Sequence, residues 1–296
     1  MSGRDHQYEL IDFGDGRKLE RFGAVVVDRP CPAAEGDAIS RPAAWREATA
    51  RYDGSRAGDG EWSPNSKKWV SDDWLYAYSS QEGEASFQLR LDALPSGQVG
   101  VFPEQRENWD WIGGQIAKPQ AEGSRRLRVL NLFAYTGAST LAAAAAGADV
   151  VHVDAARSVV DRARRNAELS GLADRPIRWI VEDVAKFCRR EVRRGNRYDA
   201  VIVDPPSYGH GPKGEVWQIN RDLMPLLELC GELTSDSRAF VLVTCHSPGI
   251  GPAELSAYLS DGIFGHCGQP PAAADMFLKT AEGRRLPSGV YARWPA

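Results

Sequence analysis

Residues 129–138 read VLNLFAYTGA, and this stretch decides the fold. The apolar run from Leu127 to Phe133 predicts a strand of a parallel sheet, because strands buried on both faces are apolar throughout. The run breaks at Thr136-Gly137, and the residues that follow, with five consecutive alanines, predict a helix that ends at Gly147. A strand, a turn of small residues and a helix bring backbone N–H groups and a helix N-terminus against a ligand.

The next apolar run, Val150 to Val153, predicts a second strand, and Asp154 closes it. A carboxylate there can accept two hydrogen bonds from a ribose diol, and its distance from Gly137 is close to the roughly 20 residues expected of a ribose acceptor. The two elements therefore indicate a nucleotide-like cofactor. The turn contains no G-x-G-x-x-G, which disfavours a dinucleotide, because that turn would hold its pyrophosphate.

A further strand, Tyr198 to Val203, ends in Asp204-Pro205-Pro206. Two successive prolines make the loop rigid at the carboxyl end of the strand, where open α/β sheets bind ligands. The acidic residue beside them makes a functional loop a better interpretation than a simple end of the strand.

Together, N-x-F-x-Y-T-G at 131–137, Val153-Asp154 and Asp204-Pro205-Pro206 resemble the class I S-adenosylmethionine (SAM)-dependent methyltransferases. Within them the chain is most similar to the bacterial large-subunit rRNA methyltransferases of the cytosine-C5 type and to their guanine-N7 relatives. The resemblance covers roughly the last two-thirds of the chain, and its motifs specify the superfamily far better than the methylated base. It implies SAM as the cofactor, no metal, and a cofactor site made of Phe102, Gln105, Asn131, Phe133, Ala134, Tyr135, Thr136, Gly137, Asp154, Ala155, Asp183 and Asp204.

The chain has 296 residues, of which 43% are hydrophobic and 26% charged, so it is long enough for two domains and can bury a core. No apolar run approaches the roughly 20 residues of a membrane span, and the N-terminus lacks a signal-peptide core, so we expect a cytoplasmic protein without a membrane partner. The net charge of −4 weighs against a general RNA coat protein but leaves room for a local basic groove. Five scattered cysteines, never spaced C-x-x-C, indicate neither zinc nor a disulfide framework: Cys31, Cys188, Cys230, Cys245 and Cys267.

Residues 1–95 predict a small α+β domain, which resembles the extra N-terminal domain of the same enzymes and suggests a role in substrate recognition. Its expected elements are strands over Phe22–Val27, Trp74–Tyr78 and Ser86–Leu91 and a helix over Pro42–Tyr52. Four tryptophans gather here, at positions 45, 62, 69 and 74. They pack in the core of the domain or stack on unpaired bases, and packing is favoured because aromatic side chains bury the most area per residue.

Residues 96–296 predict the methyltransferase domain, which opens with a segment, 98–108, that by resemblance covers the cofactor. The family pattern there is Lys-Thr-Gly-x-x-x-Asp-Gln-Arg. Gly100, Gln105 and Arg106 match it, whereas Gln98, Val99 and Glu104 stand in place of Lys, Thr and Asp. The other interpretation is a hairpin followed by a helix over Asn108–Ile116.

From Leu127 onward strands and helices alternate, which predicts an α/β Rossmann-like sheet. The remaining strands expected are Ile177–Val181 and Ala239–Thr244, and the helices are Arg157–Leu169, Val184–Arg194, Val216–Cys230 and Ala253–Leu259. Two terminal runs, Met276–Leu278 and Gly289–Trp294, match the antiparallel hairpin that ends a methyltransferase sheet. A plain Rossmann dehydrogenase has no reason for this hairpin.

Two further features bear on the cofactor and the acceptor. By resemblance Asp183 reads the adenine amino group, although it also suits the N-cap of the helix that follows. In amino-group methyltransferases an aromatic residue directly follows the two prolines, whereas here Ser207 intervenes before Tyr208, which favours methylation of carbon or N7. Lys213, in a glycine-rich loop, contacts a phosphate or is an ordinary solvated lysine.

Cys245 is the candidate nucleophile. Carbon 5 of cytosine is a poor nucleophile, so enzymes of the C5 type first add a cysteine thiolate to carbon 6. By resemblance that cysteine follows the strand Ala239–Thr244, in a turn similar to Thr244-Cys245-His246-Ser247. His246 or the loop dipoles can lower the thiol pKa. The other interpretation is a packed core cysteine, since cysteine is among the most buried residue types.

The sequence therefore predicts a SAM-dependent methyltransferase that acts on a base of large-subunit (23S) rRNA, with cytosine C5 ahead of guanine N7. Its catalytic residues are Asp204, Pro205, Pro206 and Cys245. A small-molecule or protein methyltransferase, or a SAM-binding protein without transfer activity, is the alternative that the acidic balance favours. A basic strip leading to Pro206 would decide for RNA, and an enclosed apolar pocket for a small substrate. A homodimer stays open.

Overall fold

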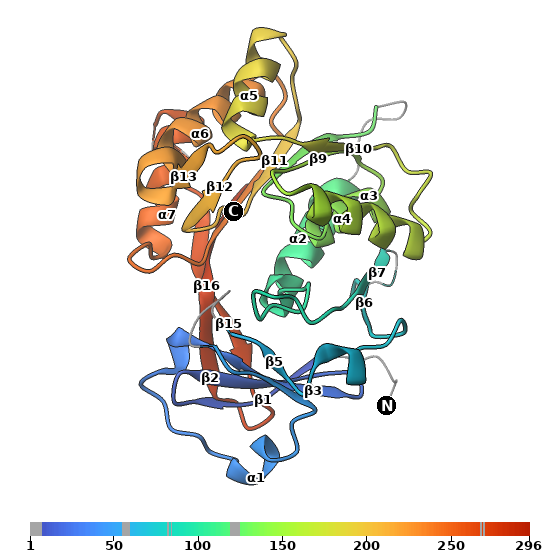
Figure 1. Ribbon diagram of the computed structural model, residues 1–296. Helices are drawn as coiled ribbons and strands as arrows, with labels where there is room; N and C mark the ends of the chain where they lie inside the picture. Colours follow the sequence, from blue (N-terminus) through green and yellow to red (C-terminus); the bar gives the residue numbers. More distant parts are fainter. Residues whose placement is uncertain are drawn as a thin grey trace. The chain divides into compact units, whose positions relative to one another are not determined.

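The computed structural model describes residues 8–54, 60–81, 83, 85–118, 125–266, 268 and 270–296 (Figure 1). Cys267 lies outside the described residues. The chain divides into two compact units. The first consists of Met1–Tyr78, Gln88–Gln105 and Phe277–Ser288, and the second of Ser79–Phe87, Arg106–Met276 and Gly289–Ala296.

A seven-stranded sheet with the order β10-β9-β8-β11-β14-β16-β15 belongs to the second unit, except that residues 277–279 of β15 and 285–288 of β16 are part of the first. Its strands are β8 (Arg128–Leu132), β9 (Asp149–Asp154), β10 (Ile177–Val181), β11 (Ala200–Val203), β14 (Phe240–Cys245), β15 (Ala272–Lys279) and β16 (Arg285–Trp294). The first five are parallel, and β16 runs antiparallel to β14. The predicted Rossmann-like sheet with an antiparallel hairpin at its end is confirmed.

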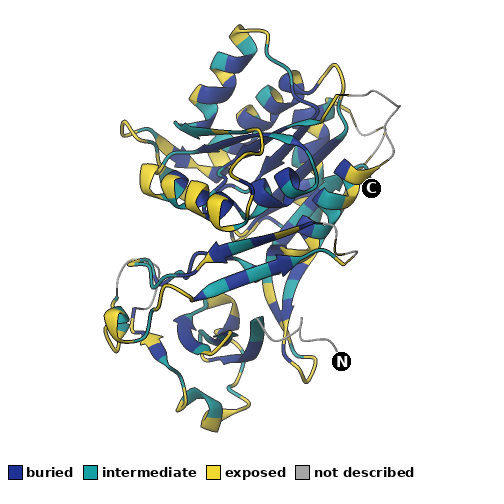
Figure 2. Ribbon diagram, turned by 90° about the vertical axis from the view of Figure 1, so that its right-hand side faces the viewer, coloured by how far each residue is buried: buried dark blue, intermediate teal, exposed yellow. Residues whose placement is uncertain are grey.

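Helices cover both faces of this sheet. Successive side chains of a strand point to opposite faces, so residues such as Leu130 and Val201 pack with α5 (Val184–Arg193), α6 (Ile219–Leu233) and α7 (Pro252–Leu259). Val129 and Ala200 pack on the other face with α2 (Arg106–Ala117) and α3 (Ala138–Ala145). The central strands β8, β9, β11 and β14 are mostly buried, and Figure 2 shows buried residues concentrated in the middle of this sheet. The β-branched runs therefore fold as expected of strands covered on both faces, and the alanine-rich run folds as helix α3.

Local signals set most element ends in the second unit. Helix α4 (Arg157–Leu169) and strand β10 have the predicted bounds, and Gly147 follows α3 with a φ of 101°. Helix α7 continues into a π-helical turn over Ser260–Phe264.

The first unit contains a mixed five-stranded sheet with the order β1-β2-β3-β4-β5. These strands are β1 (Tyr8–Gly14), β2 (Arg17–Phe22), β3 (Val25–Pro30), β4 (Ala50–Tyr52) and β5 (Trp62–Ser63), while β6 (Leu75–Ser79) and β7 (Ser86–Arg90) form a separate pair. The helix predicted over Pro42–Tyr52 is wrong beyond its first turn, because α1 comprises only Pro42–Trp45 and Ala50–Tyr52 pairs with β3 and β5. Ala50 and Tyr52 are buried and Arg51 is exposed, a period of two that suits a strand.

The four tryptophans of the first unit are held by the protein itself. Trp62, Trp69 and Trp74 form a chain of ring contacts with centroids 5.3–5.4 Å apart. Each donates its indole N–H to a backbone carbonyl, of Leu94, Pro64 and Phe22 respectively. Trp45 donates to the Asp12 carboxylate. These contacts agree with the packing interpretation of the cluster.

Candidate functional site

The turn after β8 has an unusual backbone. Phe133, Tyr135 and Gly137 have φ values of 54°, 48° and 95°, and positive φ is uncommon for residues other than glycine. Contacts with the next strand hold it, since Ala134 N donates to the Val153 carbonyl at 3.1 Å and Tyr135 N donates to Asp154 Oδ2 at 3.0 Å. The turn therefore presents its backbone in one fixed conformation at the carboxyl ends of β8 and β9.

Helix α3 begins directly after this turn, with Gly137 as its N-cap. Glycine supplies no side-chain acceptor, so the first N–H groups of α3 can bind an anionic ligand group. A Cβ at position 137 would lie 3.1 Å from the Cβ of Ala163 on α4, which means that the close packing of α4 on the turn requires glycine. Asn166, also on α4, donates to the Thr136 carbonyl at 2.9 Å and fixes the turn from the same side.

Asp154 stands at the end of β9, where the ribose acceptor was predicted. Its Oδ2 accepts from Tyr135 N and its Oδ1 from Ala156 N, each at 3.0 Å. Burial raises the pKa of Asp154. The hydrogen bonds from the backbone of Ala156, Tyr135 and Ala155 offset part of this rise. Each carboxylate oxygen has two lone pairs, so both oxygens retain capacity for a ribose hydroxyl.

Two other predicted cofactor residues have roles within the protein. Asp183 caps α5, with Oδ1 accepting from Lys186 N at 2.9 Å, as the N-cap interpretation expected. Asn131 is buried in β8 and donates to Thr140 Oγ1 at 2.8 Å, and that hydroxyl lies 2.9 Å from His152 Nδ1. Burial lowers the pKa of His152 to about 3, so this chain of bonds is neutral near pH 7 and fixes α3 on the sheet.

The residues predicted to hold the acceptor lie at the adjacent ends of β11 and β14, which are parallel neighbours. Asp204 follows β11 and accepts a 2.6 Å hydrogen bond from Thr244 Oγ1, and His246 Nε2 lies 3.5 Å from the same carboxylate oxygen. Pro205 is buried and Pro206 exposed. The structure thus brings the Asp-Pro-Pro loop and the Thr244–His246 segment together.

A short hairpin that was not predicted adjoins this loop. It consists of β12 (Tyr208–His210) and β13 (Val216–Gln218), so the helix predicted over Val216–Cys230 is wrong in its first turn and begins at Ile219. The tertiary contacts of Trp217 outweigh the local helical pattern, because its ring is buried in the sheet core and its Nε1 donates to the Pro206 carbonyl at 2.7 Å. A glycine-rich loop between two short runs of β-favouring residues was the signal in the sequence.

Trp217 also joins the two sides of the site. Its ring centroid lies 4.8 Å from that of Phe133 in the cofactor turn, with 62° between the planes. Ser207 and Ser247 give a second link between the β11 and β14 loops, with 2.6 Å between their hydroxyl oxygens. The roles of Trp217, Thr244 and Ser247 were not predicted from the sequence, because each depends on a partner distant along the chain.

Cys245 is the last residue of β14. The strand thus extends one residue beyond the predicted end at Thr244, and Cys245 lies in the strand rather than in the turn after it. Its exposed fraction is 1%, and its Sγ accepts from Ser247 N at 3.4 Å. Burial raises the pKa of the Cys245 thiol, and the charge of Asp204 raises it further. In this conformation the thiol is therefore protonated near pH 7.

Phe102 and Gln105 belong to the first unit, while the other predicted cofactor residues belong to the second. Gln105 is buried in a 3-10 turn over Pro103–Gln105, and its N–H donates to the Phe102 carbonyl at 3.1 Å. Contact of these two residues with the cofactor stays a prediction.

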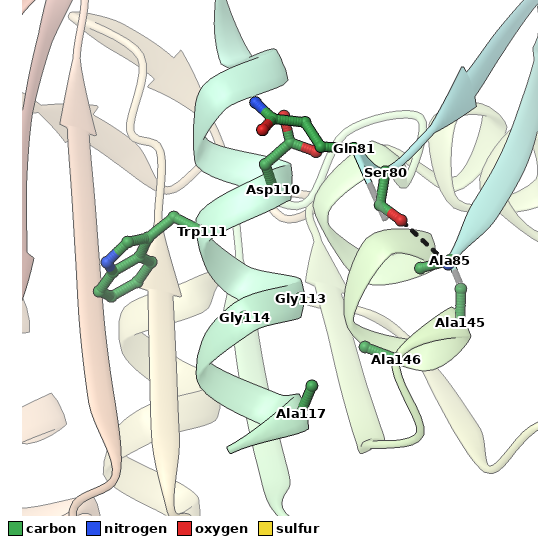
Figure 3. Close-up of a pocket in the computed structure, with 10 residues that line it drawn as sticks. All are labelled: Ser80, Gln81, Ala85, Asp110, Trp111, Gly113, Gly114, Ala117, Ala145 and Ala146. Atoms are coloured by element: carbon green, nitrogen blue, oxygen red, sulfur yellow. Dashed lines mark hydrogen bonds between the residues drawn. The ribbon is translucent and has the colours of Figure 1, made fainter. Parts of the chain in front are cut away.

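A cavity of about 390 Å³ in the second unit lies apart from these motifs (Figure 3). It is lined by small residues of α2 and α3, such as Gly113 and Ala145, and by Ser80, Gln81 and Ala85 from the turn before β7. None of the predicted site residues lines it, so it offers no pocket for a small acceptor at the motif residues. Among the described residues no cluster of three or more His, Cys, Asp or Glu side chains forms a metal site, and no helix there is long and apolar enough to cross a membrane.

The arrangement fits the chemistry of SAM. The N-terminus of α3 suits the carboxylate of the methionine moiety, and Asp154 suits the ribose. Asp183, with one oxygen used by the helix cap, and Asp204 carry further acceptors at the ends of β10 and β11.

Comparisons with known proteins bear on the family and the fold of this chain. Residues 38–260 match the protein family described as S-adenosylmethionine-dependent methyltransferase. The crystal structure of a SAM-dependent methyltransferase from Agrobacterium tumefaciens superposes with a TM-score of 0.84 at 34% identity, covering 99% of this chain and 91% of that one. SMU.776 complexed with S-adenosylhomocysteine (SAH) gives a TM-score of 0.69 at 18% identity, covering 97% of this chain and 75% of that one, which shows the fold alone.

Curated relatives match a shorter segment. Ribosomal RNA large subunit methyltransferase I of Aeromonas hydrophila is 34% identical over 128 residues, which are 43% of this chain and 30% of that protein. Ribosomal RNA large subunit methyltransferase K/L of Pseudomonas paraeruginosa is 36% identical over 149 residues, 50% of this chain and 19% of that protein. The similarity thus spans less than a third of either relative.

Proposed function

Since this chain belongs to the S-adenosylmethionine-dependent methyltransferases, we propose that it methylates a base of large-subunit rRNA, cytosine C5 in the first instance. The observation that carries the proposal is the cluster at the ends of β11 and β14, where Asp204, Thr244 and Cys245 lie together and Trp217 connects them to the cofactor turn. The choice of large-subunit rRNA as the substrate rests on the names of the Aeromonas and Pseudomonas relatives.

The main contribution of the protein residues to methyl transfer is to position the donor and the acceptor base. SAM, when bound, supplies a methyl group on a sulfonium, and in-line transfer needs near-attack geometry rather than a metal. The fixed turn at 133–137 and Asp154 hold the donor, and the Asp204–Pro206 loop holds the acceptor base beside it. The base leaves its stack to enter the site.

Cytosine C5 also needs a nucleophile, and Cys245 is the residue placed to act as one. Its thiolate adds to carbon 6, and carbon 5 then takes the methyl group from the sulfonium, which leaves SAH. Transfer of the C5 proton to water, with departure of the thiolate from carbon 6, restores the ring. Because the resting thiol is buried and protonated, it must lose its proton as the base binds. Asp204, whose charge acts on this thiol, and His246 are the groups that can take the proton.

The burial of Cys245 favours guanine N7 as the second candidate. An N7 lone pair attacks the methyl group unaided, so that reaction requires no thiolate and leaves Cys245 as a packing residue.

The test is Cys245→Ala, with Cys230→Ala, another buried cysteine of the second unit, as the matched control for loss of a packed thiol. Methyl transfer from SAM to deproteinised rRNA would be measured together with SAH binding by calorimetry. We expect Cys245→Ala to lose transfer by at least 1000-fold with SAH affinity kept, and Cys230→Ala to keep both. Near-normal transfer by Cys245→Ala, with the product mapped to guanine N7 by mass spectrometry, would replace C5 by N7. No transfer to RNA by the wild-type protein would reject the RNA proposal itself.

A further inference from the structure

The charge of the chain is unevenly distributed. Residues 125–199 contain 15 of the 36 Lys and Arg residues but only 9 of the 40 Asp and Glu residues. This stretch is therefore strongly basic, while the rest of the chain, with 21 basic and 31 acidic residues, is acidic. A protein of net charge −4 thus carries a local excess of positive charge over β8 to β10, the helices between these strands and helix α5.

Part of this charge lines a groove. The groove has a volume of about 340 Å³ and lies at the amino ends of β8, β9 and β10, opposite to the strand ends that carry Asp154 and Asp204. Its side chains include three arginines and one acid: Arg128, Arg175, Arg178 and Asp149.

The pairing of the strands sends Arg128 and Arg178 to the same face of the sheet. Arg128 pairs with Asp149 and Arg178 pairs with Val151, and residues 149 and 151 share one face because side chains alternate along β9. Both guanidinium groups also act on Tyr198. The Arg128 group lies 5.1 Å from the centre of that ring. Burial raises the pKa of the Tyr198 hydroxyl, and the positive charges of both arginines partly offset this rise.

Two acidic residues near the groove, Asp149 and Asp199, are already engaged. Asp149 is 3.8 Å from Arg126, and Asp199 pairs with Arg125. Arg175 and Arg178 are exposed and form no ion pair with any described residue. A groove that gathers arginines without matching acids attracts an anion, and the planar guanidinium fork matches phosphate oxygens.

We propose that this groove binds the phosphate backbone of RNA at the end of the sheet opposite to the acceptor loop. The inference rests on the proposed function, which makes RNA the substrate, and adds a second contact surface to it. Strand β8 has five residues, about 17 Å of extended chain, so the bound RNA continues at least that far from the methylated nucleotide.

The test uses Arg175→Ala/Arg178→Ala in the full chain. Its matched control is Arg46→Ala/Lys67→Ala, which removes two exposed positive charges from the first unit. Affinity for deproteinised rRNA would be measured by fluorescence anisotropy over a range of salt concentrations. We expect the slope of log K against log[salt] to become shallower by about 1.4 in the groove variant, from about 0.7 for each lost phosphate contact on single-stranded RNA, and to stay unchanged in the control. SAH affinity and Tm should stay the same in both variants, since all four side chains are exposed.

The outcomes separate this inference from the proposed function. If the wild-type protein methylates rRNA and the groove variant keeps the wild-type salt slope, the groove inference is wrong and the function stands. If the control loses as much slope as the groove variant, the effect is one of net charge, and the inference also fails. If the wild-type protein neither binds nor methylates rRNA, the proposed function fails first. If inorganic phosphate binds the wild-type protein one to one and not the variant, while the RNA slope is equal in both, the groove is a site for a small anion and the inference is overturned.

Discussion

Trp217→Phe tests whether the link between cofactor turn and acceptor loop matters for transfer. Phenylalanine keeps an aromatic ring beside Phe133 but cannot donate the 2.7 Å hydrogen bond to the Pro206 carbonyl. Loss of that bond removes about 0.5–1.5 kcal/mol, and the unfilled space of the smaller ring costs about 1 kcal/mol more. A total of about 2 kcal/mol should lower Tm by about 4–8 °C.

The effect on transfer should exceed the effect on the cofactor. If the freed loop raises the barrier to methyl transfer by about 1 kcal/mol, kcat falls about fivefold. If the reacting atoms are displaced by about 1 Å, kcat falls by up to about 100-fold. SAH affinity should change by less than about twofold, because the contact with Phe133 remains. Trp217→Leu removes both contacts, so it should weaken SAH binding as well.

Trp179→Phe is the matched control. Trp179 lies half-buried on β10 with its ring 4.8 Å from that of His152, and the same chemical change there touches neither loop. Transfer to rRNA in single-turnover assays, SAH calorimetry and thermal unfolding would be measured for each variant. The reasoning is refuted if Trp217→Phe keeps normal kcat, or if Trp179→Phe loses as much transfer as Trp217→Phe.

Further predictions concern the cofactor turn. Gly137→Ala should lower Tm by several degrees more than Gly195→Ala. Both positions have a positive φ, 95° and 68°, but only a Cβ at position 137 meets a neighbour, the Cβ of Ala163 at 3.1 Å. Equal losses of Tm would show that this contact does not matter. Asp154→Asn should weaken SAH binding by about 10- to 100-fold in calorimetry, because a carboxamide cannot accept at both positions; an unchanged Kd would remove Asp154 from the site. The raised pKa of Asp154 means that the folded protein favours the protonated carboxyl. As pH rises through the window just above 3.8, the free energy of unfolding should therefore fall, while SAH affinity should rise because the carboxylate forms. Both trends should be absent in Asp154→Asn.

The parallel sheet was predictable because each of its elements has a local signal. Short, mostly apolar runs such as Val150–Val153 and Ala239–Thr244 predict buried strands, and the arginine-rich period of 157–169 predicts an amphipathic helix. Polar residues at the carboxyl ends of neighbouring strands meet by the geometry of a parallel sheet alone, so Asp154 and Asp204 could be assigned to one edge before the fold was known.

The strand predicted over Phe22–Val27 is wrong because a local turn at Gly23, with a φ of 60°, divides it between β2 and β3. The other errors came where a contact distant in sequence decided the outcome. The run Val216-Trp217-Gln218 continues directly into a helical pattern. It is a strand because it pairs with Tyr208–His210, while the Trp217 ring is buried and bonded to the Pro206 carbonyl. Residues 46–52 likewise have no local signal for a strand except the alternation of Ala50, Arg51 and Tyr52. The burial of Cys245 could not be read from the sequence either, because it depends on the strand that pairs with β14.

That strand, β16, shapes the acceptor side. Val290 pairs with Cys245, which places Gly289 against the segment that leaves β14. A Cβ at position 289 would lie 2.7 Å from both the Cys245 carbonyl oxygen and His246 Nδ1, and the φ of Gly289 is 106°. The glycine therefore lets the antiparallel strand approach closely enough to set where His246 points, 3.5 Å from Asp204. The terminal hairpin distinguishes this sheet from that of a dehydrogenase and also forms one wall of the proposed site.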